Sequence, residues 1–200
     1  MEKNLNERLR KRASQHFLDS IAVKQEAEKV LPDSVVAGVL AMVECLRAGG
    51  KVMACGNGGS AADAQHFAAE LIGRFERERQ ELAAIALTTD TSILTAVGND
   101  YSFDEIFSKQ VRGLGKKGDI LLGISTSGNS KNVVKAIESA KKLGIKIIAL
   151  TGNGGGKIAQ LLDKDDIHLC APSTRTARIQ ETHLVLLHAL CDGVDHVLLD

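Results

Sequence analysis

The sequence predicts a three-layer α/β/α sandwich, in which helices cover both faces of a five-stranded parallel sheet. Five short apolar runs recur along the chain, and the intervals between them are long enough for helices. The first four runs are nearly continuous rather than alternating, as in strands that are covered on both faces. Each of these four ends in small polar residues, namely GNGGS, TTDTS, STSGNS and TGNGGG. Because ligands of such folds bind at the carboxyl ends of the strands, we expect the functional site among these loops.

Two helices are expected before the first strand. Apolar residues recur at helical spacing over residues of about 4–30, and Leu31-Pro32-Asp33 predicts a break, with Asp33 as the N-cap of a second helix that ends at Arg47. The expected strands are residues 52–55, 83–87, 120–124, 145–150 and 167–170. Further helices are expected after the first strand, over residues 131–143 and over residues 176–199. The two terminal helices are long, and we expect them to cover the sheet or to pack against other subunits.

The composition favours one cytoplasmic domain over residues 1–200. We divide it into N-terminal helices (about 4–48), a sheet core (about 50–172) and a C-terminal helix (about 174–199). The 25 basic residues balance the 25 acidic ones, which gives no electrostatic reason to expect nucleic acid or an anionic membrane as a partner. The charged N-terminus does not have the apolar core of a signal peptide, and no apolar run approaches the roughly 20 residues of a membrane span. The four cysteines are scattered, which favours reduced thiols in a cytoplasmic protein.

The glycine loop over residues 56–61, GNGGSA, suggests a dinucleotide-binding fingerprint at first sight. Such a site requires an acidic residue about 20 residues past the glycines, at the end of the second strand. Asp90 does end that strand, but it comes considerably later, after a helix and a charged stretch. A nicotinamide cofactor is therefore disfavoured.

The loop over residues 125–130, STSGNS, predicts a phosphate site instead. It places four hydroxyl groups between an apolar strand and the N-terminus of a helix. Hydroxyls, free backbone N–H groups and the helix dipole together favour an anion. An ordinary helix cap would account for one of these hydroxyls but hardly for four. A sugar phosphate could bind this loop through its phosphate and the glycine loop through its sugar.

Two pairs of side chains could bind a metal. His66 and Glu70 are four residues apart on the helix after the glycine loop and therefore share a face. Gln180 and His188 are eight residues apart on the last helix, offset by roughly 80°, so both face one pocket only if that pocket is broad. Each pair alone is weak evidence for a metal site, because a His–Glu pair at this spacing is more often a solvated surface contact.

At this point the chain resembles the sugar isomerase (SIS) domain family, and more narrowly the bacterial phosphoheptose isomerases, over essentially its whole length. The blocks that carry the resemblance are GKVMACGNGGSAADAQHFAAEL (50–71), TAVGNDYSFDEIFSKQV (95–111), GDILLGISTSGNSKNVVKAI (118–137), ALTGNGGG (149–156) and ARIQETHLVLLHALCDGVD (177–195). The resemblance implies the SIS fold and the conversion of sedoheptulose 7-phosphate to D-glycero-D-manno-heptose 7-phosphate, the first step toward the heptose of lipopolysaccharide and related glycans. It also implies a homotetramer with one zinc ion per subunit.

The resemblance further implies roles for particular residues. It gives His66, Glu70, Gln180 and His188 as zinc ligands, and all four positions hold the expected residue. It gives substrate contacts at Asn57, Gly58, Gly59, Glu70, Asn99, Asp100, Ser125, Thr126, Ser127, Ser130 and Gln180. Aldose–ketose isomerisation moves a proton between C1 and C2 through an enediol, so it requires a base and an acid. Glu70 is the candidate base, His188 the candidate acid, and zinc would polarise the carbonyl as a Lewis acid.

A different class of function competes with this interpretation. A non-catalytic SIS paralogue binds the replication initiator protein as a tetramer, and it shares much of the glycine loop and the ARIQE helix. The paralogue is expected to lack the residues that match Glu70 and His188, and this chain has both. A SIS domain that only senses a sugar phosphate is less favoured, because such domains usually accompany a DNA-binding module. His183 is expected to be a packing histidine, not a ligand.

Overall fold

The computed structural model describes residues 2–200, with side chains from residue 4 onward, and confirms the three-layer α/β/α fold. The helices are α1 (Glu2–Val30), α2 (Pro32–Arg47), α3 (Gly59–Ile72), α4 (Thr91–Asp100), α5 (Ile106–Leu114), α6 (Lys131–Lys142), α7 (Gly156–Leu161) and α8 (Thr176–Leu199). The strands are β1 (Val52–Cys55), β2 (Ala84–Ala86), β3 (Ile120–Ser125), β4 (Lys146–Gly152) and β5 (Ile167–Ala171). Short 3₁₀ turns, η1 (Phe103–Glu105) and η2 (Asn153–Gly155), precede α5 and α7.

The five strands form one parallel sheet in the order β2-β1-β3-β4-β5. The chain leaves β1 toward one edge of the sheet and later returns to build the other half outward from β3. In doubly wound folds such a reversal leaves a crevice between the carboxyl ends of the two strands, here β1 and β3, and ligands bind there. The glycine loop follows β1 and the STSGNS loop follows β3, so both predicted binding loops border this crevice.

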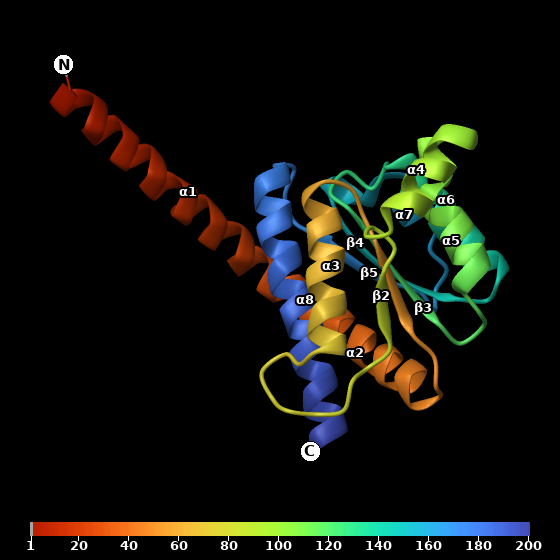
Figure 1. The fold of residues 1–200 in the computed structure, drawn as a ribbon. Helices are drawn as coiled ribbons and strands as arrows, with labels where there is room; N and C mark the ends of the chain where they lie inside the picture. Colours follow the sequence, from red (N-terminus) through yellow and green to blue (C-terminus); the bar gives the residue numbers. More distant parts are fainter. Residues whose placement is uncertain (1) are drawn as a thin grey trace.

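Side chains that alternate along the strands divide the core into two layers. Helices cover both faces of the sheet (Figure 1). One layer packs α2, α3 and α8 against residues such as Ala54, Leu122 and Leu150. The other packs α5, α6 and α7 against Met53, Leu121 and their neighbours. The sheet is therefore covered on both faces, as the continuous apolar runs predicted.

The N-terminal helix α1 projects from the rest of the fold (Figure 1). Its apolar residues are largely exposed, with Phe17 at 72% and Leu9 at 55% of their full accessible surface. The C-terminal helix differs, because it packs on α2, α3 and α1. By length and composition α8 is the one helix in the described part of the chain that could cross a membrane, but 44% of its apolar window is buried in the protein, as in an ordinary core helix.

Two local predictions were wrong. Asp33 does not cap α2; the N-cap is Leu31, because Pro32 takes the first helical position and Asp33 falls inside the first turn. The second strand is not buried on both faces; β2 has three residues, and Ile85 is 39% exposed. The physical reason is that β2 lies at the edge of the sheet, where the described chain covers it incompletely.

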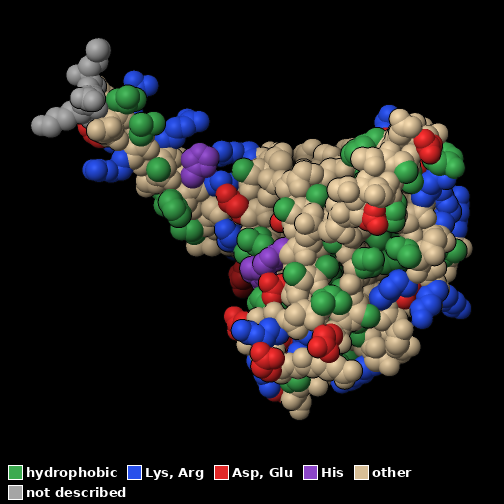
Figure 2. All heavy atoms as spheres, in the orientation of Figure 1, with side chains coloured by type: hydrophobic (Ala, Val, Ile, Leu, Met, Phe, Trp, Pro, Cys, Tyr) green, Lys and Arg blue, Asp and Glu red, His purple; other side chains and the backbone are tan. Residues whose placement is uncertain are grey.

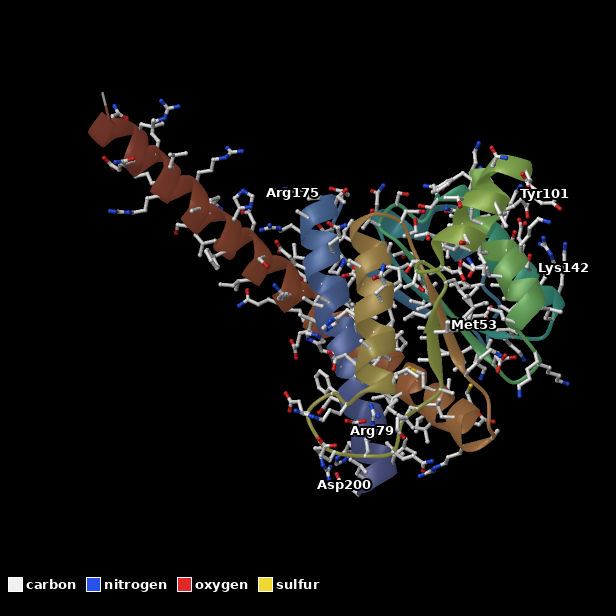
Figure 3. The ribbon with its side chains drawn as sticks, in the orientation of Figure 1. Met53, Arg79, Tyr101, Lys142, Arg175 and Asp200 are labelled. Carbon is white, nitrogen blue, oxygen red and sulfur yellow. The ribbon has the colours of Figure 1, made fainter. Side chains whose placement is uncertain are left out.

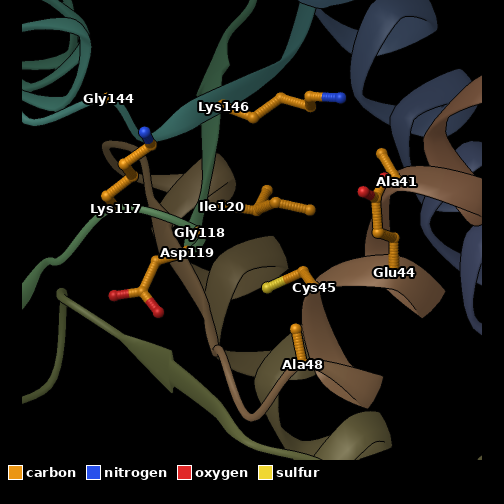
Figure 4. A pocket seen from close by; sticks show the side chains of 10 residues that line it. All are labelled: Ala41, Glu44, Cys45, Ala48, Lys117, Gly118, Asp119, Ile120, Gly144 and Lys146. Atoms are coloured by element: carbon orange, nitrogen blue, oxygen red, sulfur yellow. The ribbon is translucent and has the colours of Figure 1, made fainter.

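A cavity of about 240 Å³ lies at the amino-terminal edge of the sheet, between the end of α2 and the starts of β3 and β4 (Figure 4). Glu44, Cys45, Asp119 and Lys146 are among the residues that line it. Because it lies at the opposite end of the strands from the polar loops, it is separate from the crevice described above.

Candidate active site

The two binding loops are joined to each other by a pair of amides. Asn57, in the loop after β1, donates from Nδ2 to Oδ1 of Asn132, and Asn132 donates back from Nδ2 to Oδ1 of Asn57, both at 2.8 Å. Asn132 lies in the first turn of α6 and is only 2% exposed. Asn132 was not among the predicted site residues; its signal in the sequence is a polar side chain on a face of α6 that is otherwise buried. This pairing fixes the loop that follows β1 relative to the loop that follows β3.

The hydroxyls of the STSGNS loop bond to one another and to the loop backbone. Ser125 Oγ and Ser130 Oγ are 2.9 Å apart, and the Asn129 N–H donates to Ser127 Oγ at 3.2 Å. The N–H of Gly128 donates to the carbonyl of Ser125, which closes a tight turn. Ser130 is the N-cap of α6 by position, but its side chain makes no capping bond. The Val133 N–H donates to Asn132 Oδ1, and the N–H groups of Lys131 and Asn132 keep their capacity to donate. Thr126 is half-buried in the same turn. The loop thus combines hydroxyls and a helix N-terminus, as an anion site requires.

The loop after β4 supports this turn from behind. Gly128 has a φ of +66°, and a Cβ there would overlap the carbonyl of Gly155. Asn129 Oδ1 accepts a hydrogen bond from the Lys157 N–H at 3.0 Å, and the Gly128 carbonyl accepts one from the Ile158 N–H at 2.9 Å. Only glycine at position 128 permits this approach.

Three candidate ligands meet between α3 and α8, which run side by side in the same direction (Figure 1). His66 Nε2 lies 2.9 Å from His188 Nε2, and Glu70 Oε1 lies 3.4 Å from His66 Nε2. The ring of Phe75 packs against His188 at 5.5 Å between centroids. Histidine side chains are visible on the exposed face over these two helices (Figure 2). His66, Glu70 and His188 are therefore neighbours in space although they lie on two distant helices.

Gln180 lies nearer the N-terminal end of α3. Its amide packs on Gly59, the first residue of α3, so closely that a Cβ at Gly59 would overlap the amide nitrogen. Seven helical residues separate Gly59 from His66, a rise of about 10 Å. The structure thus places Gln180 beside the predicted substrate residues Gly58 and Gly59, and apart from the group formed by His66, Glu70 and His188.

The donors suit a zinc ion in chemical type. Two imidazole nitrogens and a carboxylate oxygen are the ligands of many catalytic zinc sites, where bonds of about 2.0–2.1 Å hold ligand atoms roughly 3.3 Å apart. The separations of 2.9 Å and 3.4 Å are close to that value. As they stand, the side chains do not form a closed cage, since no group of three His, Cys, Asp or Glu side chains in the described chain is arranged to enclose an ion. The side chain of His66 is 42% exposed and that of Glu70 21%, so both are accessible to solvent.

Comparison with known proteins identifies the family. The SIS domain family model matches residues 15–152. Phosphoheptose isomerase from Dechloromonas aromatica is 63% identical over 94% of this chain and 96% of the relative, and that from Neisseria gonorrhoeae is 60% identical over 96% and 98%. The chain belongs to the SIS domain family and, within it, to the phosphoheptose isomerases.

Solved structures of this family have the same fold. Phosphoheptose isomerase GmhA from Neisseria gonorrhoeae superimposes with a TM-score of 0.90 at 57% identity, covering 94% of this chain and 99% of that one. The phosphoheptose isomerase from Francisella tularensis gives 0.91 at 48% identity, covering 93% and 97%. A sugar isomerase domain of an RpiR transcription factor from Sphaerobacter thermophilus, at 19% identity and a TM-score of 0.64, shares the fold alone.

Two positions expected to bind substrate in a phosphoheptose isomerase lie apart from the rest. Asn99 and Asp100 are exposed at the end of α4, and Asn99 Nδ2 donates to Asp100 Oδ1 at 2.9 Å. Within the described chain no hydrogen bond links either one to the loops after β1 and β3. Asp90, which a nicotinamide site would need for a ribose, caps α4 by accepting from the Ile93 N–H.

Two further histidines have structural partners, whereas Asp63 has an unpaired carboxylate oxygen. His183 is fully buried, burial lowers its pKa, and its Nε2 lies 2.9 Å from the Thr151 carbonyl, as expected for a packing histidine. His168 is also held with a lowered pKa by burial, and it contacts Thr151 Oγ1. Asp63, one turn before His66 on α3, has its pKa raised by burial, and its Oδ2 has no hydrogen-bond partner. His183 and His168 are thus both held against Thr151 of β4.

Proposed function

We propose that this protein is a phosphoheptose isomerase that converts sedoheptulose 7-phosphate to D-glycero-D-manno-heptose 7-phosphate. The observation that carries the proposal is the meeting of Glu70, His66 and His188 on two helices, one of which begins in the glycine loop. Relatives with this name are about 60% identical over nearly the whole chain. The reaction begins the heptose supply for lipopolysaccharide or related glycans.

Glu70 is the proposed base. In the ketose-to-aldose direction its carboxylate removes a proton from C1, giving an enediol, and returns the proton to C2. His188 acts as the acid–base partner that moves a proton between the oxygens at C1 and C2. Glu70 Oε1 and His188 Nε2 both lie within 3.4 Å of His66 Nε2, which brings a base and an acid close together.

His66, Glu70, Gln180 and His188 are the residues proposed to hold one zinc ion per subunit. When bound, zinc would supply a Lewis acid that polarises the substrate carbonyl. Gln180 is the weakest of these donors, and it would reach the others only by turning its amide away from Gly59. We therefore expect a labile site that stays open to substrate, where Glu70 and Gln180 also contact the sugar.

Substrate orientation follows from the two joined loops. Ser125, Thr126, Ser127 and Ser130 are proposed to hold the phosphate, with charge balanced by the α6 N-terminus, hydroxyls and amides. Asn57, Gly58 and Gly59 are proposed to hold the sugar. Asn57 uses only one donor and one acceptor in its pair with Asn132, so it retains one of each for a hydroxyl.

The protein is proposed to act in the cytoplasm as a homotetramer. The exposed apolar side chains of α1 support assembly, because an isolated projecting helix of this kind needs a partner surface to bury them. Assembly would also account for Asn99 and Asp100, which lie apart from the other site residues within one subunit.

The initiator-binding alternative is not favoured, because the relatives carry the isomerase name and this chain keeps Glu70 and His188. The decisive assay incubates the protein with sedoheptulose 7-phosphate, with and without a chelator, and follows the aldose product. We expect turnover that the chelator abolishes and zinc restores. Glu70→Gln should abolish turnover and leave the fold and assembly intact. No turnover with zinc present, or a nearly normal rate for Glu70→Gln, would contradict the proposal.

A further inference from the structure

Arg79 lies in the connection between α3 and β2, at the far end of α3 from the substrate loops (Figure 3). Its side chain is 3% exposed and pairs with Asp195 of α8, itself 4% exposed, at 2.6 Å between Nε and Oδ1. A buried charge must be compensated nearby, because the interior solvates it poorly. Such a pair therefore restricts the arrangements that the two helices can adopt.

The same guanidinium also binds the C-terminal end of α3. Nη2 donates to the carbonyl of Glu70 at 2.7 Å, and Nη1 donates to the carbonyl of Leu71 at 2.9 Å. Carbonyls in the last turn of a helix have no partner within the helix, so a cation there completes the hydrogen bonds and complements the dipole. One of the two helix carbonyls that Arg79 binds thus belongs to the proposed base itself.

Asp195, the partner of Arg79 on α8, also lies on the segment that carries a site residue. Asp195 follows His188 by seven residues, which is close to two helical turns and puts both on one face. Cys191 lies between them, and burial raises the pKa of its thiol to about 12. The negative charges of Glu70 and Asp195 also raise this pKa, and the positive charge of Arg79 lowers it. Phe75, in the same connection as Arg79, packs against the His188 ring. Arg79 thus connects the segment that carries Glu70 to the segment that carries His188.

We propose that Arg79 is a positioning residue of the active site, which fixes α3 relative to α8 through Asp195 and the Glu70 carbonyl, and thereby sets the separation of Glu70 and His66 from His188. The inference rests on the proposed function of these three side chains. The buried Arg79–Asp195 pair thus has a role in the geometry of the site as well as in the stability of the protein.

The test measures binding of Co²⁺, whose visible absorption reports the geometry of its ligands, together with unfolding in urea. Arg79→Met and Asp195→Asn should each lower Co²⁺ affinity by about 10–100-fold, as loss of a supporting partner does in other metal sites, and change the absorption bands. Arg79→Lys keeps the charge and should restore part of the affinity. It also serves as the milder variant should Arg79→Met not fold.

A matched control exists at the amino ends of β1 and β3, where Lys51 Nζ pairs with the fully buried Asp119 at 2.6 Å. Lys51→Met should destabilise the protein but leave Co²⁺ affinity within about twofold of wild type. Wild-type affinity and absorption in the Arg79 and Asp195 variants, or an equal loss in Lys51→Met, would overturn the positioning role. Failure of the wild-type protein to bind Co²⁺ through His66 and His188 would instead overturn the proposed metal site.

Discussion

Replacing Gly59 by alanine should lower activity without lowering stability. A Cβ at this position would overlap the Gln180 amide nitrogen and stand 3.2 Å from its Cδ. The amide must then move by about 1 Å to reach ordinary van der Waals contact. A displacement of that size near a reacting centre costs up to about 100-fold in rate. This loss corresponds to about 2.7 kcal/mol of transition-state stabilisation.

The fold should tolerate the same change. Gly59 is absent from the glycines with positive φ, and it begins α3, where alanine is favoured over glycine. The free energy of unfolding should therefore stay within about 1 kcal/mol of wild type or rise. Gly113→Ala is the matched control, because this helical glycine is exposed on α5 and a Cβ there meets nothing within 4 Å. It should raise stability by up to about 1 kcal/mol and leave activity unchanged.

The assay compares kcat/KM for sedoheptulose 7-phosphate in Gly59→Ala, Gln180→Ala and the double variant, with urea unfolding in parallel. If the alanine acts by displacing Gln180, it should cost little more once that amide has been removed. Losses that multiply in the double variant would show that Gly59 acts through something other than Gln180. A normal rate for Gly59→Ala alone would refute the reasoning outright.

Three further outcomes are expected. Hydrogen bonds from Lys135 and Ser108 lower the pKa of Glu105 to about 2, so Glu105→Gln should destabilise the protein at neutral pH. Because the folded-state pKa lies below the ordinary 4.5, the difference in stability between wild type and Glu105→Gln should shrink as the pH falls from about 4.5 toward about 2. Urea midpoints of the two proteins that differ by a constant amount across this range would contradict the role of the ion pair. Asn132→Ala leaves Asn57 without its partner and should cost about 1–3 kcal/mol of stability. It should also raise KM more than it lowers kcat. An unchanged KM would show that the Asn57–Asn132 pair has no role in substrate binding. Burial raises the thiol pKa to about 11 in Cys45 and to about 12 in Cys55 and Cys191. An alkylating reagent near pH 8 should therefore modify the half-buried Cys170 first, which peptide mass spectrometry can check. Equal labelling of all four cysteines would contradict the burial of the other three.

The sequence predicted the layers, the five strands and the carboxyl-edge location of the loops, because continuous apolar runs and polar strand ends are local signals. It misplaced the start of α2, where Pro32 and Asp33 both carry a helix-start signal and the proline took the first position. It also overestimated the burial of β2, since an apolar run does not reveal whether a strand lies at an edge. The order of the strands, which creates the crevice between β1 and β3, is a tertiary property that spacing does not encode.

The candidate site likewise divides into local relations, which the sequence predicts, and tertiary relations, which it does not. The spacing of His66 and Glu70 predicted a shared face correctly, because four residues on one helix is a local relation. No spacing could show that His188 lies 2.9 Å from His66, since this depends on how α3 and α8 pack. Asn132, Arg79 and Asp195 escaped notice for that reason, because each is an ordinary polar residue until its partner on another element is known. Their signal in the sequence would be polar residues on otherwise buried faces.

The parallel packing of α3 and α8 accounts for the placement of the whole site. Contacts occur in the same order along both helices: Gly59 with Gln180, then His66 with His188, and finally the end of α3 with Asp195 through Arg79. A shift of one helix by a single turn, about 5.4 Å, would break all three relations together. The close approach at Gly59 fixes the upper end of this register, and the buried pair at Arg79 fixes the lower end. The imidazoles between them therefore occupy the part of the helix pair that is constrained from both sides, which is where reacting groups need the smallest positional error.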